Sequence, residues 1–289
     1  MSPTQKVFPI RNYDLLATLA SGQAFRWQSH GDGWVGVIGR QWVRLHAADD
    51  LLTAQTAGPV ADWNWLTHYL QVELDLAPVL ASFPDDDSMR TAVRACQGLR
   101  LLRQDYWECL ASFILSSTKQ IIQIRQIVSL LCERFGEPVP VPSGHAPAHA
   151  FPTPERLVSV TEAELRACKM GFRAPYLLAA ARAIVSGDLL LDALQQLPIT
   201  QARAELVKLP GVGPKIADCV LLFAYGFPAA FPVDVWVMKA LRELYFPRRR
   251  PTRPRLQRFT ETYFGPHAGY AQQYLFHYMR TRKPARGLT

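Results

Sequence analysis

The sequence predicts an α+β fold, in which an N-terminal antiparallel β-sheet domain is followed by a larger all-helical domain. Two observations indicate this class. Short runs rich in aromatic and β-branched residues fall within residues 22–58, and from about residue 60 the apolar residues recur with a helical period. The chain has 289 residues, 49% of them hydrophobic, which is enough for two domains with apolar cores. We place the boundary so that the domains span 1–90 and 91–289.

The strands are predicted from short runs between turns. The runs WVGVI at 34–38 and WVRL at 42–45 have the aromatic and β-branched composition of strands. The sequences GDG at 31–33 and GRQ at 39–41 break them as turns do. We expect these strands to form the small antiparallel sheet.

The helical part follows from apolar periodicity. One apolar stripe runs from Leu102 to Ile114, and a helix is predicted over 121–135, where Gly136 ends it. Residues 137–154 contain six prolines and no apolar period, so they are predicted to be a surface loop or linker. Further helical patterns occur at 155–167, 174–186, 200–208, 214–225, 235–245 and 267–281.

The charge of the chain is concentrated in its C-terminal half. Residues 1–154 carry 12 basic and 14 acidic side chains, whereas residues 155–289 carry 20 basic and 10 acidic ones. This balance favours a polyanionic partner, most simply nucleic acid, although a solubilising surface would have the same composition. No window holds about 18 consecutive apolar residues, so no membrane span is expected. The N-terminal residues lack the apolar core of a secretory signal.

The cysteines exclude two classes of site. There are five of them, an odd number with no CxxC pair, so neither a disulfide framework nor a zinc site is expected. We interpret them as reduced thiols, mostly in the core, of a cytosolic or nuclear protein.

The segment 204–225, AELVKLPGVGPKIADCVLLFAY, has the pattern of a helix-hairpin-helix. Glycines suit a tight turn, and Pro214 suits the first position of the second helix. Such a turn presents backbone N–H groups, and N–H groups at a helix N-terminus bind phosphate. The motif, at about 200–225, therefore favours contact with a DNA backbone independent of base sequence over an ordinary αα-hairpin.

Lys215 and Asp234 are the candidate catalytic pair. Lys215 follows the hairpin in the first turn of a helix, where the helix dipole disfavours a cation and so favours a nucleophilic amine. A solvated lysine on a phosphate is the simpler alternative. Asp234 follows an extended Pro-containing stretch and opens an apolar helix, so it is either only an N-cap or also a carboxylate directed at the same cleft.

These residues resemble the signature of a known family. LPGVGPKIADC followed by PVDVW is similar to the helix-hairpin-helix, Gly/Pro-rich loop and aspartate of base-excision DNA glycosylases, most closely the 8-oxoguanine DNA glycosylases. The resemblance extends to SGQAFRW at 21–27, LLRQD at 101–105 and the Ser116–Ser117 pair. It also includes GFRA at 171–174 and AQQYLF at 271–276. It therefore covers nearly the whole chain.

The resemblance implies roles for individual residues. Lys215 is the nucleophile that attacks C1′ and forms a Schiff base, and Asp234 assists it. The flipped base enters a pocket, in which the Gly22 carbonyl accepts the N7–H that distinguishes 8-oxoguanine from guanine. The other implied pocket residues are Gln272, which reads the Watson–Crick edge, and Cys219 and Phe276, which sandwich the base. Without the resemblance, Cys219 and Phe276 would be taken as core residues, and Gly22 as a turn glycine.

The implied DNA contacts include several departures from the family. Phe172 is the wedge pushed into the base stack and Arg173 reads the estranged cytosine, while Gly211, Val212 and Gly213 form the hairpin that holds the backbone. Thr118, Lys119 and Gln120 replace three asparagines of the family, and Gln123 replaces an arginine that contacts the opposite base. Two of three opposite-base contacts are thus changed, so the resemblance does not imply a strict preference for cytosine opposite the lesion. Trp236 replaces a phosphate-binding histidine and is either a backbone contact or a packing residue.

Arg248–Arg255 supplies five arginines in eight residues and is absent from the family pattern. It is expected either to grip flanking DNA or to form a solvated, Pro-broken surface loop. Such a basic run is only weak evidence for a nuclear localisation signal.

Three functional classes are weighed. The favoured one is a bifunctional 8-oxoguanine glycosylase and AP lyase. An alternative is a monofunctional glycosylase for alkylated or other damaged purines, and a further one is a non-catalytic DNA-binding module. An iron–sulfur glycosylase is disfavoured because no cysteine follows Asp234.

The favoured class implies the remaining properties. No cofactor is expected, apart from a monovalent cation at the backbone carbonyls of Leu209 and Val212. The partner is double-stranded DNA containing oxidised guanine, the protein is expected to be a monomer, and it has no membrane association. The compartment is the cytoplasm, on the nucleoid, for a bacterial protein and the nucleus for a eukaryotic one.

Overall fold

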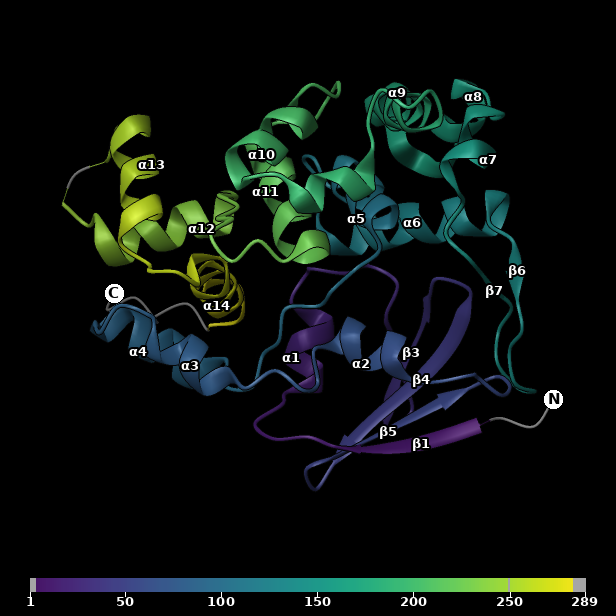
Figure 1. The fold of residues 1–289 in the computed structure, drawn as a ribbon, viewed down its shortest axis with the longest axis horizontal. Coiled ribbons are helices and arrows are strands. Elements are labelled where there is room, and N and C mark those ends of the chain that lie inside the picture. The colour runs from purple at the N-terminus through teal and green to yellow at the C-terminus, as the bar shows by residue number, and fades with distance from the viewer. Residues whose placement is uncertain (1–3, 249, 283–289) are drawn as a thin grey trace, which may run out of the picture.

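The computed structural model describes residues 4–248 and 250–282. It has the predicted α+β architecture, with a five-stranded antiparallel sheet beside a larger helical part (Figure 1). Within the described residues, no helix is long and apolar enough to cross a membrane.

The sheet has five strands in the order β1-β5-β4-β3-β2, and every pair is antiparallel. The strands are β1 (Thr4–Pro9), β2 (Gln28–His30), β3 (Gly33–Ile38), β4 (Gln41–Ala48) and β5 (Leu51–Thr56). The strands predicted at 34–38 and 42–45 are confirmed as β3 and β4. Strand β1 was not predicted, and it pairs along its whole length with β5, from Thr4 opposite Thr56 to Pro9 opposite Leu51.

One face of the sheet is covered by the helices α1 (Leu15–Ala20) and α2 (Asn64–Leu70). Trp27 lies in this layer, is 1% exposed, and donates its indole N–H to the Tyr69 hydroxyl at 3.0 Å. Gly36 of β3 permits this packing, because a Cβ there would lie 2.6 Å from the Trp27 ring. The side chain of Leu102, at the start of the helical part, enters the same core.

The helical part surrounds α5 (Tyr106–Leu115), whose residues from Cys109 to Leu115 are all buried. The other elements of this part are α6 (Ile121–Phe135), α7 (Pro154–Val158), α8 (Glu162–Leu165), η1 (Arg166–Met170), η2 (Gly171–Arg173), α9 (Ala174–Val185), η3 (Leu191–Gln196), α10 (Ile199–Val207), α11 (Pro214–Val220), η4 (Leu221–Tyr225), α12 (Val235–Ala240), η5 (Leu241–Tyr245), α13 (Arg253–Thr262) and α14 (Ala268–Thr281). The helix predicted at 121–135 is confirmed with the same bounds, and Gly136 follows it.

Two short helices of the N-terminal segment, α3 (Leu76–Ala81) and α4 (Asp87–Ala95), pack on the helical core. Their buried residues Val79, Met89 and Ala92 belong to the same cluster as Tyr274 of α14, and Figure 1 shows α3 and α4 next to that helix. The domain boundary at residue 90 stays a prediction.

Two expectations about loops hold only in part. Within 137–154, β6 (Pro138–Val139) and β7 (Ala148–His149) form a short antiparallel ladder, and Val139 packs on Trp42 of the sheet. Within Arg248–Arg255, where a Pro-broken surface loop was one of two expectations, α13 begins at Arg253. Pro254 occupies the first turn of α13, the one part of a helix that tolerates proline.

Candidate active site

A cavity of about 990 Å³ lies where the helix-hairpin-helix faces α5, α14 and the turn after α1. This volume is at the upper end of the usual range for ligand pockets. The candidate residues that line it come from distant parts of the sequence: Gly22, Thr118, Lys119, Gln120, Gly211, Gly213, Lys215, Cys219, Asp234, Trp236, Gln272 and Phe276. The fold thus brings both candidate catalytic residues and all four candidate base-pocket residues to one cavity.

The hairpin between α10 and α11 is tight because of Gly211. Its φ is +80°, and a Cβ there would lie 2.4 Å from the ring of Tyr176. Gly213 is the N-cap of α11 and Pro214 its first residue, so the N–H groups of this end are not covered by a capping side chain. The Leu209 carbonyl, one of the two candidate cation ligands, accepts a hydrogen bond from the Val212 N–H at 3.1 Å.

Lys215 lies in the first turn of α11 and reaches into the cavity. Its Nζ is 3.3 Å from the Ser116 hydroxyl at the end of α5, and 5.2 Å from the centre of the Phe113 ring. These contacts fix the amine in the wall of the cavity without pairing it to a carboxylate.

Asp234 both caps a helix and faces the cavity. One carboxylate oxygen caps α12 by accepting the backbone N–H groups of Trp236 at 2.9 Å and Val237 at 2.8 Å. The carboxylate is therefore held in one orientation, facing the cavity. Burial raises the pKa of Asp234, while the N–H group of Val237 and the charge of Lys215 act in the opposite direction. The positive charge of Lys215 thus favours the ionised form of Asp234 across the cavity.

The closed end of the cavity carries an unsatisfied amide. Gln272 of α14 is 3% exposed, and its Oε1 has no hydrogen-bond partner among the residues that the structure describes. A buried polar atom without a partner costs about 1–3 kcal/mol, so this one is suited to a ligand that donates to it. Phe276 lies one helical turn further along the same face and also lines the cavity.

Cys219 lies one helical turn after Lys215. Burial raises the pKa of its thiol to about 12, against a lowering contribution from Lys215. The thiol is therefore neutral and a poor nucleophile, and it presents a polarisable surface to the cavity.

The turn at Gly22 is held by two glutamines that sequence reasoning missed. Gln23 donates to the carbonyls of Thr18 and Arg100 and accepts the Leu102 N–H, each at 2.8 Å. Gln273, the neighbour of Gln272, donates to the Ser21 carbonyl at 3.1 Å. The sequence signal for this link was a pair of adjacent glutamines in the otherwise apolar and aromatic first half of α14.

For the excision of 8-oxoguanine that the resemblance implies, we expect Gly22→Ala to lower the rate by about tenfold or more, because a φ of +80° costs an alanine about 1–2 kcal/mol and its methyl group enters the pocket. The added Cβ would lie 2.7 Å from Ile121 Cδ1 and 3.6 Å from Phe276. The measurement is kcat/KM on 8-oxoguanine and on guanine. Gly39→Ala is the matched control, since its φ is +57° with open space around it. Unchanged selectivity of Gly22→Ala would refute the role of Gly22.

The candidate wedge and opposite-base residues lie beside the cavity. Phe172 is 51% exposed on η2, as a wedge requires. Arg173 is only 2% exposed: it donates to the Ser117 carbonyl and the Thr118 hydroxyl, and its guanidinium lies 4.3 Å from the Phe172 ring centre. In this structure Arg173 is thus turned toward the protein. Gln123 caps α6, since its Oε1 accepts the Gln120 N–H at 3.0 Å.

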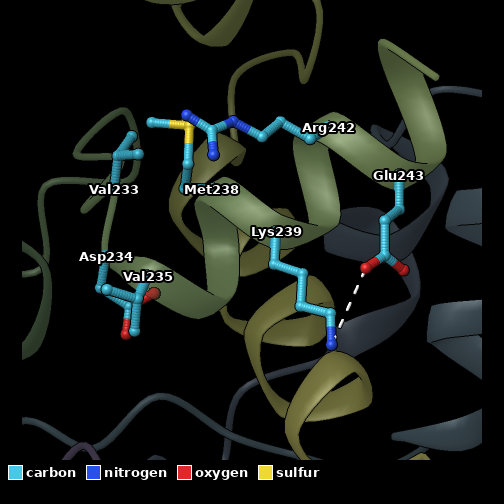
Figure 2. A pocket seen from close by; sticks show the side chains of 7 residues that line it. All are labelled: Val233, Asp234, Val235, Met238, Lys239, Arg242 and Glu243. Carbon is cyan, nitrogen blue, oxygen red and sulfur yellow. Dashed lines mark ion pairs between the residues drawn. The ribbon is translucent and has the colours of Figure 1, made fainter. Parts of the chain in front are cut away.

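A second hollow, of about 620 Å³, adjoins the cavity and shares Asp234 and Val235 with it. Figure 2 shows Lys239 and Glu243 on its wall, with Nζ and carboxylate oxygen 3.8 Å apart. Val235 is 79% exposed between the two spaces. Trp236 is half-buried, and Lys239 lies 5.7 Å from the centre of its ring.

In the part of the chain that the structure describes, no group of three or more His, Cys, Asp or Glu side chains is placed to hold a metal ion. All five cysteines are buried and free.

Comparison with known proteins identifies the family. A family model described as HhH-GPD superfamily base excision DNA repair protein matches residues 111–266, more than half of the chain. The chain belongs to this superfamily. A second model, the 8-oxoguanine DNA glycosylase N-terminal domain, matches residues 7–110. This HhH-GPD protein is thus a DNA glycosylase with the N-terminal domain of the 8-oxoguanine group.

Individual relatives agree with the family. The N-glycosylase/DNA lyase OGG1 of Arabidopsis thaliana is 32% identical over 94% of this chain and 80% of its own length. A structure of MBOgg1 in complex with a low-affinity DNA ligand has a TM-score of 0.90 and 33% identity, over 97% of this chain and 99% of that one. The Clostridium acetobutylicum 8-oxoguanine glycosylase/lyase, solved with double-stranded DNA containing cytosine opposite 8-oxoguanine, has a TM-score of 0.89 and 30% identity, over 97% and 98% of the two chains.

Proposed function

We propose that this HhH-GPD protein is a bifunctional DNA glycosylase and AP lyase that flips 8-oxoguanine out of duplex DNA and excises it through a Schiff base on Lys215. One observation carries the proposal: the amine of Lys215, the carboxylate of Asp234 and the unsatisfied amide of Gln272 line the same cavity. A base can reach such a group only by leaving the stack.

In the proposed reaction the lone pair of Lys215 Nζ attacks C1′ of the flipped nucleotide. The bond from C1′ to the base nitrogen breaks, and the base leaves with the electron pair and takes up a proton. The carboxylate of Asp234 stabilises the positive charge that develops on the sugar. Ring opening gives the Schiff base, loss of a C2′ proton then breaks the C3′–O bond on the 3′ side, and water releases Lys215.

Base selection rests on hydrogen bonding at the closed end of the pocket. The Gly22 carbonyl accepts the N7–H of 8-oxoguanine, whereas guanine would place the lone pair of N7 against it. A site that loses one buried hydrogen bond discriminates strongly, because two acceptors are left facing each other. Gln272 supplies an amide to the Watson–Crick edge, and Cys219 and Phe276 contact the two faces of the ring.

A substrate panel tests the proposal against the alternative of a monofunctional glycosylase for alkylated purines. Duplexes carrying 8-oxoguanine, guanine, 3-methyladenine or an abasic site are incubated with the protein, and base release and strand cleavage are measured separately. We expect release of 8-oxoguanine and cleavage at the abasic site. Release of 3-methyladenine without cleavage would instead support hydrolysis by water, for which Lys215 has no role.

We expect excision opposite C, A, G and T to differ by no more than about tenfold, the discrimination that one remaining polar contact supplies. The reason is that Thr118 and Gln123 stand where the family contacts the opposite base, and Gln123 is engaged as a cap. The double variant Thr118→Asn, Gln123→Arg should gain preference for C. A strict requirement for C in the unaltered protein would contradict this account.

We further infer that the reaction needs no cofactor and no iron–sulfur cluster. The proposed chemistry requires only an amine, a carboxylate and hydrogen-bonding groups, and all of these are side chains or backbone of this chain. Double-stranded DNA is the partner, and the hairpin at Gly211, Val212 and Gly213 supplies its backbone contacts. The compartment and the monomeric state stay predictions.

A further inference from the structure

Helix α14 presents three side chains in one row along the cavity. Gln272, Phe276 and Arg280 follow one another at intervals of four residues, and all three line the cavity. Gln272 is buried, whereas Phe276 and Arg280 are half-buried. The row therefore runs from the closed end to the rim, where it ends in the guanidinium of Arg280.

A second arginine approaches the same point from α6. Arg125 lies one helical turn after Ile121, a residue of the cavity wall whose side chain borders Gly22. Ile121 and Phe276 both border Gly22, and Arg125 and Arg280 each follow one helical turn later, in α6 and in α14. Burial lowers the pKa of Arg280, and the positive charge of Arg125 lowers it further.

Neither arginine has a counter-ion in the part of the chain that the structure describes. Arg280 donates one N–H to the Ala20 carbonyl, and the Nε groups of both arginines are buried without an acceptor. No carboxylate lies within 4.0 Å of either guanidinium among the described residues. The residues outside that part contain no Asp or Glu. Two unpaired cations side by side are unfavourable unless an anion joins them.

We propose that Arg125 and Arg280 together bind a backbone phosphate of the lesion-bearing strand, next to the nucleotide that enters the cavity. This inference rests on the proposed function, because a strand that places one base in the cavity must carry its neighbouring phosphates over the rim. Guanidinium groups bind phosphate through paired, charge-assisted hydrogen bonds. Such contacts set the register of DNA without reading its sequence.

The experiment measures DNA binding and does not depend on excision. Arg125→Gln, Arg280→Gln and the double variant bind a duplex with a tetrahydrofuran abasic analogue, over a range of salt concentration. We expect the double variant to lower the slope of log Kd against log salt by about one, the value for one phosphate contact. Arg280→Lys should keep the slope, because it keeps the charge. Arg94→Gln is the matched control, because Arg94 is exposed on α4 and lies outside the cavity.

A second measurement locates the phosphate. Neutral methylphosphonates replace the phosphates flanking the lesion one at a time. At one position, the methylphosphonate should weaken DNA binding by the unaltered protein but should not weaken binding by Arg280→Gln. Equal losses at every position in both proteins, with unchanged salt slopes, would overturn the phosphate site. If excision of 8-oxoguanine persists, only this site fails; if 8-oxoguanine is not excised at all, the proposed function itself fails.

Discussion

Replacing Lys215 by glutamine is expected to lower base excision by about 10³-fold or more while DNA binding persists. The substitution removes the nucleophile, yet it leaves the backbone N–H groups of the hairpin and the rest of the cavity in place. Glutamine also preserves most of the side-chain volume beside Phe113 and keeps an uncharged N–H donor on the side of Ser116. Single-turnover release of 8-oxoguanine measures the first effect, and a binding titration with abasic-analogue DNA measures the second.

Lys208→Gln is the matched control for that variant. Lys208 lies at the end of α10 in the same motif and pairs with Glu205 at 2.6 Å, on an exposed surface. The control removes one positive charge without touching the cavity, so it should excise normally. Excision by Lys215→Gln at the normal rate would show that water or another group is the nucleophile.

Asp234→Asn is expected to reduce excision by about 10²-fold or more with little loss of stability. Asparagine caps a helix about as well as aspartate, so α12 should keep its first turn. What is lost is the charge that faces Lys215 and the developing sugar cation. Asp234→Ala should lose the same activity and also about 1 kcal/mol of stability, because the N–H groups of Trp236 and Val237 lose their acceptor.

The pH profile separates the two functions of Asp234. Burial raises the pKa of this carboxyl, and only its ionised form stabilises a cation. Activity of the unaltered protein should therefore fall as the pH drops through a pKa above the usual aspartate value, and Asp234→Asn should lack this acidic limb. Thermal unfolding compares the stability of the two variants. Equal activity of Asp234→Asn and the unaltered protein would show that Asp234 acts only as an N-cap.

Elements with strong local signals were predicted correctly from the sequence. Strands β3 and β4 are dense in β-branched and aromatic residues between turns, and α6 has a clear apolar stripe and a terminal glycine. Strand β1 was missed because its register depends on β5, which lies more than 40 residues later in the chain. Helix α13 was missed because Pro254 was taken as a breaker, although a first-turn proline is compatible with a helix.

The candidate site was predictable where a motif marks it. Lys215 and Asp234 stand in recognisable segments, and the structure places both on one cavity. Residues that act through tertiary contacts carried no such mark. Gln273 donates to the carbonyl of Ser21, which lies 252 positions away in the sequence, and Arg280 lines the cavity only because α14 packs along it. For Arg173 the sequence was misleading. It suggests an exposed side chain that reads the opposite base, whereas in the structure the side chain is buried and donates to the Ser117 carbonyl.

Borohydride trapping tests the central claim most directly. The protein is incubated with a duplex carrying one 8-oxoguanine, the Schiff base is reduced to a stable amine, and the cross-linked peptide is identified by mass spectrometry. We expect one covalent adduct, on the peptide that contains Lys215, and none with Lys215→Gln. An adduct on another residue, or release of 8-oxoguanine without any adduct, would contradict the mechanism.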